Sequence, residues 1–147
     1  MTAAYSFQDC VATITGPSGS ANLGYGASVA DEGITIAMAE DKNTMTVGAD
    51  GNVMHSQHAS KAGHLTVRLL QTSPINQLLM AIYDAQQANP TVWGKNVIVV
   101  SQTQSGDITT CNKVAFKKKP DIKYSKDGAV YDWQFDCGSI DTILGTY

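Results

Sequence analysis

The sequence lacks paired cysteines, a secretory signal and any long apolar run. Cys10, Cys111 and Cys137 lie far apart and form no CxxC pair, so a zinc site is not predicted. We interpret them as reduced, buried small hydrophobes in a protein assembled in a cytoplasm. No stretch approaches the ~20 apolar residues of a membrane helix, and the N-terminus, MTAAYSFQDC, has no signal-like region. We therefore expect a soluble chain without membrane insertion, retained in the cell that makes it until lysis.

The sequence also lacks an excess of positive charge. The formal charge of the 147 residues is −3, which argues against tight nucleic-acid binding, because neutralising phosphates requires a basic face. If copies assemble, the charge adds up. Six copies would carry −18 (6 × −3), enough to shape the electric field inside a shared channel.

What the sequence does contain is a globular composition with many short β patterns. Hydrophobic residues make up 43% and charged residues 16%, which favours a single domain over residues 1–147. Apolar alternation is clearest over residues 64–70, and in residues 129–137 it places three aromatic side chains on one face. Residues 22–30 are either a strand with a bulge or a loop. Further strands are expected at residues 10–15, 33–38, 41–46, 96–104, 108–117 and 121–125.

One helix is predicted, at about residues 73–89. Ser73 can cap it, Pro74 suits its first position, and apolar residues then recur with helical spacing up to Ile82. Turn signals at residues 105–107 and 126–128 indicate hairpins. Together these elements predict a mainly β fold of two packed antiparallel sheets, a sandwich or partial barrel, with one flanking α-helix.

A long polar stretch at about residues 39–63 interrupts the strand pattern and carries His55 and His58, with His64 just beyond. Compact domains rarely keep a loop of about twenty residues unless it serves binding or assembly. An Asp-Gly turn is expected within it at residues 49–52. We therefore predict that this stretch is an assembly loop.

The candidate chemical sites in the sequence are weak. The three histidines could bind a metal, but no acidic or sulfur ligand stands at a familiar spacing, so loop histidines are the simpler interpretation. Asp50-Gly51-Asn52 resembles a calcium loop only superficially. Ser, His and Asp occur without a nucleophile elbow. No enzyme activity and no cofactor are predicted.

Two charge clusters carry open alternatives. Lys117-Lys118-Lys119 could contact nucleic acid, could be a solvated hairpin end, or could form an intersubunit contact. Acidic residues between positions 31 and 50 are either solvated surface or groups facing a channel, where like charge would keep DNA from adhering. The acidic candidates are Glu32, Glu40, Asp41 and Asp50.

Trp133 and Phe135 also allow two interpretations. Core burial is the simpler one, and the alternative is an aromatic patch covered only when subunits meet. Such a patch would also suit a different function, a capsid decoration or carbohydrate-binding module.

The strings EGITIAMAEDKNTMTVGADG, MHSQHASKAGHLTVRLLQTSPIN, NVIVVSQ and VAFKKKPDIKYSKDG resemble the tail tube proteins of long-tailed phages, several of them with contractile tails. The resemblance spans nearly the whole chain, from Tyr5 to about Leu144. It implies two β-sheets packed roughly orthogonally with an outer helix, as in the related type VI secretion tube proteins. It also implies six-subunit rings whose inner sheets join into one barrel that conducts DNA.

The resemblance further implies a structural virion protein of the tail, assembled in the host cytoplasm, without catalysis. Its expected partners are copies of itself, the tail sheath, the tape-measure protein, the baseplate hub and the tail terminator. By order along the chain, residues 39–63 match the loop that reaches an adjacent ring. The contact residues implied there are Asp41, Lys42, Asn43, Asp50, His55, His58 and Lys61.

Overall fold

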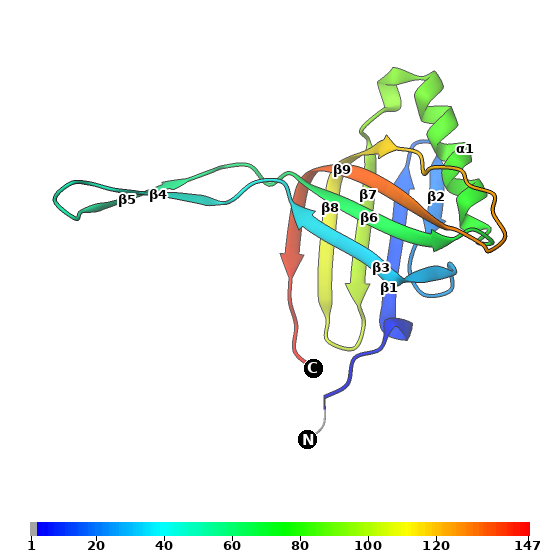
Figure 1. Cartoon of the computed structure of the whole chain (residues 1–147), viewed down its shortest axis with the longest axis horizontal. Coiled ribbons are helices and arrows are strands. Elements are labelled where there is room, and N and C mark those ends of the chain that lie inside the picture. Colours follow the sequence, from blue (N-terminus) through cyan, green and yellow to red (C-terminus); the bar gives the residue numbers. More distant parts are fainter. Residues whose placement is uncertain (1–2) are drawn as a thin grey trace.

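The computed structural model describes residues 3–147, which form one seven-stranded antiparallel sheet, a separate two-stranded sheet and one α-helix (Figure 1). The order in the large sheet is β2-β1-β7-β8-β9-β6-β3, and β4 pairs with β5 in the small one. The strands are β1 (Cys10–Gly16), β2 (Gly19–Asn22), β3 (Val29–Met38), β4 (Asn43–Val47), β5 (Val53–Gln57), β6 (Gly63–Leu70), β7 (Asn96–Gln102), β8 (Asp107–Lys118) and β9 (Val130–Ile143). The helices are α1 (Ile75–Ala88) and two short 3-10 turns, η1 (Phe7–Asp9) and η2 (Pro90–Val92).

The large sheet folds over itself through its longest strand. The first half of β9 pairs with β6, whereas its second half pairs only with β8. At the bend the β7–β8 register shifts, Lys113 of β8 takes a φ of 54°, and a side chain at the facing Gly138 would meet the Lys113 side chain. Figure 1 shows the outcome: β3, β6 and the first half of β9 cross β1, β7 and β8.

The mainly β prediction, with two packed layers and one flanking helix, is therefore confirmed. The two layers are halves of one continuous hydrogen-bonded sheet instead of two separate sheets, because β8 and β9 run through both. Among the described residues, no helix is long and apolar enough to cross a bilayer.

The core lies between the two layers. Leu65, Val67 and Leu69 of β6 alternate inward with 0% exposure, as the sequence pattern predicts. They meet Trp133 and Phe135 of β9, also 0% exposed. The core interpretation of these aromatics is thus confirmed. The alternative of an exposed aromatic patch on β9, and with it the surface proposed for carbohydrate binding, is wrong because these rings are sealed inside the sheet.

Helix α1 closes one end of the core, close to the predicted boundaries. The Ser73 hydroxyl accepts the Ile75 N–H at 3.3 Å and donates to the Ala27 carbonyl at 2.6 Å, which ties the helix start to the body. Leu79 and Ile82 are buried, and the fully buried Gln86 exchanges two side-chain hydrogen bonds with Asn96, at 2.7 and 2.9 Å. The sequence pattern located the helix but did not predict this polar pair.

Three strand predictions need correction. Residues 121–125 are not a strand: Ile122 and Tyr124 are exposed and pair with no neighbour, so residues 126–128 are not a hairpin turn. The expected strand 33–38 begins earlier, at Val29, and contains a bulge with Gly33 at a φ of 62°. Residues 22–30, expected as a bulged strand or a loop, divide: β2 ends at Asn22 after a tight hairpin with β1, residues 23–28 are irregular, and β3 begins at Val29.

Candidate assembly surfaces

The segment predicted as a long loop is a β-hairpin, which we call the arm (residues 39–62). Strands β4 and β5 pair antiparallel, and Figure 1 shows them projecting from the body. The Ala39 N–H donates to the Ala62 carbonyl at 3.1 Å, which holds the base of the arm together. The expected Asp-Gly turn is present, with Gly51 at a φ of 88° and Asp50 accepting the Asn52 N–H. Strand β5 was missed because VMHSQ has no clean alternation.

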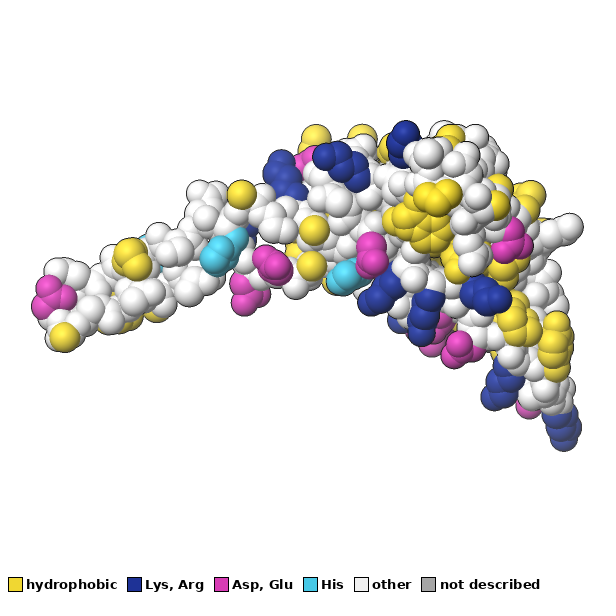
Figure 2. Space-filling view, turned by 90° about the horizontal axis from the view of Figure 1, so that it is seen from above, with side chains coloured by type: hydrophobic (Ala, Val, Ile, Leu, Met, Phe, Trp, Pro, Cys, Tyr) yellow, Lys and Arg dark blue, Asp and Glu magenta, His cyan; other side chains and the backbone are white. Residues whose placement is uncertain are grey.

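The arm carries apolar side chains that the rest of the described chain, residues 3–147, leaves exposed. By register, Met45, Val47 and Val53 share one face, and Met54 lies on the other. Their exposed fractions are 51–59%, and Figure 2 shows apolar atoms along the projecting arm. A two-stranded hairpin without a core is marginally stable in water, and exposed apolar side chains of this kind are typical of contact surfaces. The sequence did not single out these residues.

The predicted polar residues of the arm mostly hold the hairpin together. Asn43 Nδ2 lies 3.1 Å from His55 Nδ1, and Thr44 Oγ1 lies 2.8 Å from His58 Nε2. Lys42 Nζ donates to the Ser60 carbonyl at 3.4 Å. These side chains are exposed, so the bonds fix the shape of the arm without burying it.

Two further residues connect the arm region to the body. Lys61 Nζ lies 3.1 Å from Asp141 Oδ1 of β9. His64 lies outside the arm, on β6, with its Nδ1 2.8 Å from Asp136 Oδ1. The three histidines thus have different partners, and no cluster of metal-binding side chains occurs within residues 3–147.

The acidic candidates do not form one group. Glu40 and Asp41 lie together at the start of the arm, and Asp50 lies in its turn. Glu32 lies on β3 beside the bulge, at the far end of that strand from the arm. All four are exposed. The structure therefore gathers only Glu40 and Asp41 into one place.

The basic candidates lie at the end of β8. Lys117, Lys118 and Lys119 are exposed, and none of them forms an ion pair within the described part of the chain. The connection that follows adds Lys123 and Lys126. This end of the body is a solvated basic surface, available to an acidic partner.

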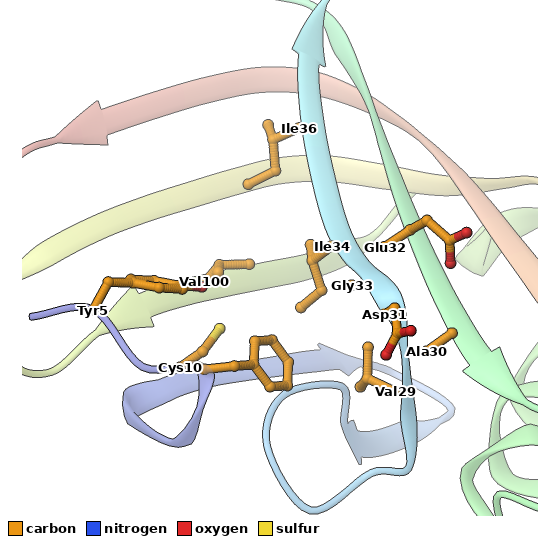
Figure 3. A pocket seen from close by; sticks show the side chains of 11 residues that line it. Tyr5, Cys10, Val29, Ala30, Asp31, Glu32, Gly33, Ile34, Ile36 and Val100 are labelled. Atoms are coloured by element: carbon orange, nitrogen blue, oxygen red, sulfur yellow. The ribbon is translucent and has the colours of Figure 1, made fainter.

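A pocket of about 520 Å³ with a mixed polar and apolar lining lies between β3 and the N-terminal part of the chain, next to Val100 of β7. In Figure 3, Ile34 and Ile36 of β3 point toward Val100 and Cys10, whereas Glu32 points away from them. Burial raises the pKa of the Cys10 thiol, which makes it a poor nucleophile. The pocket therefore offers contact area, and its walls do not bring reactive groups together.

The sheet also has open edges. β3 is ten residues long and is the outermost strand on one side. The second half of β9 pairs with β8 on one side and with no strand on the other. On that free side, within residues 3–147, the Ile140 N–H donates to the Lys61 carbonyl at 2.9 Å. On the opposite side β2 is short, with four residues. Exposed edges of this length invite pairing with another chain.

Comparison with known proteins identifies the lineage. The sequence matches the family described as bacteriophage PhiTE tail tube protein over residues 2–145. No curated protein matches. Among solved structures, the chain is similar to the sheath-tube complex of an extracellular contractile injection system, PVC, in its extended state, with 14% identity, a TM-score of 0.58 and coverage of 95% of this chain and 90% of that chain.

A second similar structure is the tube-terminating cap of the anti-feeding prophage, with 13% identity, a TM-score of 0.55 and coverage of 99% of this chain and 95% of that chain. At such identities these likenesses establish the fold. The family match covers nearly the whole sequence. The chain therefore belongs to the phage tail tube protein family, as a structural subunit of the tail tube.

Proposed function

We propose that six copies of this chain close into a ring, and that stacked rings form a tube through which double-stranded DNA leaves the virion. The observation that carries the proposal is the arm. It is an ordered hairpin whose apolar side chains stay half exposed, so it needs a second copy to cover them.

The open edges of the sheet support ring closure. The second half of β9 and the short β2 lie on opposite sides of the layer that contains β1, β7 and β8. A head-to-tail contact between unlike edges closes into a ring when the rotation permits. It also removes the unpaired backbone groups that would otherwise favour aggregation. The number six rests on the resemblance to tail tube proteins.

Stacking of rings is assigned to the arm. Its apolar residues would supply the contact area, while Lys42, Asn43, His55 and His58 connect its two sides. Asp41 and Asp50 remain exposed for polar contacts with the neighbouring ring. The Lys61–Asp141 ion pair sets where the arm leaves the body.

The partners follow from the relatives. The similar structures come from a sheath-tube complex and a tube-terminating cap, so a contractile sheath and a terminator are the expected neighbours here. A baseplate of the anti-feeding prophage is also similar, with a TM-score of 0.54. The tape-measure protein and the baseplate hub complete the set. In this role the protein works by shape, without catalysis or cofactor, in tails assembled in the host cytoplasm.

The test is to remove the arm without disturbing the body. Deleting residues 41–61 joins Glu40 to Ala62, and the Ala39–Ala62 hydrogen bond shows that these ends already meet. We expect the deletant to remain a folded monomer by circular dichroism and gel filtration, and to form no tubes in negative-stain electron microscopy. Asp84→Asn, an exposed position on α1 that leaves the arm and the sheet edges unchanged, is the control and should polymerise.

Two results would contradict the proposal. One is long tubes formed by the deletant, which would remove the arm from stacking. The other is wild-type protein that stays a single small species at high concentration, which would fit a decoration protein better than a tube subunit.

A further inference from the structure

The folded sheet has two outer faces of different chemistry. One lies on β1, β7, the first half of β8 and the second half of β9, and we call it the low-charge face. Strand register places its members on one side: Val11 opposes Ser101, Thr13 opposes Val99, and Thr110 opposes both Val99 and Asp141. The low-charge face comprises Val11, Thr13, Thr15, Val97, Val99, Ser101, Ile108, Thr110, Asn112, Ser139, Asp141 and Ile143.

Burial confirms the direction in which these side chains point. The residues between them in the same strands, including Ala12, Ile14, Ile98 and Cys111, are 0% exposed and form the core. Because successive strand residues point to opposite sides, the low-charge face points away from the core. It is built from β-branched and small hydroxyl side chains that lie close to the sheet.

The low-charge face contains neither lysine nor arginine. Its one carboxylate, Asp141, is paired with Lys61 at 3.1 Å. Lys113 lies beyond it, at the bend in β8. The face is thus close to neutral, although the chain as a whole is not.

The other outer face, on β3, β6 and the first half of β9, is charged. His64 lies beside Asp136 at 2.8 Å, and Arg68 Nε lies 3.6 Å from Asp132 Oδ1. The exposed lysines at the end of β8 continue it. Mixed, oriented charges of this kind suit specific recognition of another protein.

On the basis of the proposed tube, we propose that the low-charge face lines the channel and lets DNA slide because it offers no charge for the phosphates to bind. DNA affinity comes mainly from lysine and arginine contacts to phosphates, with release of counterions. A lining without such groups gains none of that energy. The charged face then lies on the outside of the tube, toward the sheath.

This arrangement differs from a channel that repels DNA with acidic groups. Glu32, Glu40 and Asp41 lie on β3 and the arm, outside the low-charge face. A neutral lining neither holds nor excludes a polyanion, so passage should depend little on ionic strength.

The first experiment locates the two faces in assembled tubes. Thr110→Cys on the low-charge face and Thr66→Cys on the charged face are each labelled with one mercury atom as monomers, then polymerised and imaged by cryo-electron microscopy. We expect the label at the channel wall for Thr110→Cys and on the outer surface for Thr66→Cys, after subtraction of labelled wild type. Absence of tubes from wild-type protein would contradict the proposed function, whereas tubes with the reverse label positions would overturn only this inference.

The second experiment tests the missing charge. Thr13→Lys, whose register partners Val99 and Asn22 are uncharged, should give tubes that retain short duplex DNA protected from nuclease, because each ring then offers about six phosphate contacts. The affinity for DNA should fall about 10³-fold between about 50 mM and about 200 mM salt. Thr13→Gln, an uncharged control, and wild-type tubes should protect no DNA, and Thr66→Lys should bind DNA that stays sensitive to nuclease. Protected DNA in wild-type tubes at physiological salt, or none in Thr13→Lys tubes, would overturn the inference.

Discussion

The body and the arm are both antiparallel β structure, yet they differ in what stabilises them. In the body, β6 and β9 pack against a second layer, and their inward side chains reach 0% exposure. In the arm, β4 and β5 have only each other, and nearly every residue is exposed. Secondary structure alone therefore does not show which part of the chain is stabilised by its own core.

The difference shows how stability and assembly are divided within this chain. The body buries a core of its own, so we expect it to fold before it meets a partner. The arm leaves its apolar side chains exposed, so under the proposed function its contribution to free energy should appear only on polymerisation. Substitutions in the body should therefore affect unfolding of the monomer more than matched substitutions in the arm.

The largest effect is expected from Trp133→Ala. The Trp133 ring is 0% exposed and packs edge-to-face with Phe116, with 6.0 Å between the ring centroids. Its Nε1–H donates to Asn76 Oδ1 at 3.0 Å. The cavity and the lost bond should reduce the free energy of unfolding by about 3–5 kcal/mol. Met45→Ala in the arm should change it by less than about 0.5 kcal/mol. Urea denaturation of the monomer, followed by circular dichroism, measures both, and a comparable loss for Met45→Ala would mean that the arm packs on its own body.

An intermediate effect is expected from the polar pairs. Gln86→Leu removes the two side-chain hydrogen bonds between Gln86 and the buried Asn96. Asn96 then keeps only its hydrogen bond to the Val114 carbonyl, at 3.1 Å. The unfolding free energy should fall by about 1–3 kcal/mol. In the arm, Asn43→Leu breaks the exposed contact with His55 and should cost less than about 0.5 kcal/mol. The same urea titration compares them, and equal losses would erase the distinction between the two regions.

The smallest effect concerns thiol reactivity. The hydrogen bond with Cys111, followed by burial, raises the pKa of Cys137, and burial raises that of Cys10. Since the thiolate is the reactive form, a raised pKa means less thiolate at a given pH, and modification of Cys10 should require a higher pH. In Met45→Cys, the introduced thiol at position 45 should react first with iodoacetamide at about pH 8. Peptide mass spectrometry gives the order, and rapid modification of Cys137 in the native protein would contradict it.

Much of the body was predictable because its signals are local. Alternation over residues 64–70 and helical spacing from Ile75 to Ile82 each indicate one buried face, although Leu78 within that spacing is 48% exposed. The arm was only partly predictable. Its turn was found, but β5 was not, because strands without a buried face need no alternation. Residues 121–125 show the converse: their composition suits a strand, yet no partner edge is present beside them.

The candidate surfaces were predicted less well than the fold. The sequence indicated Lys42, His55 and His58 as contacts of a loop, and the structure shows them bonded across a hairpin. The exposed apolar residues of the arm and the low-charge face were not singled out. Both depend on which side of a strand meets the core, and that is known only once the strands are paired.

By itself, the sequence determined that this is a mainly β domain with one helix, a core face on β6 and β9, and a long segment set apart from the body. Only the tertiary structure decided that β8 and β9 join both layers, that the arm is a free hairpin, and that Lys61 meets Asp141 across 80 residues of chain. The physical reason is the sequence separation of the contacts involved. Side-chain periodicity reflects neighbours within a few residues, whereas strand pairing and charge placement depend on contacts between distant segments that form together when the chain folds.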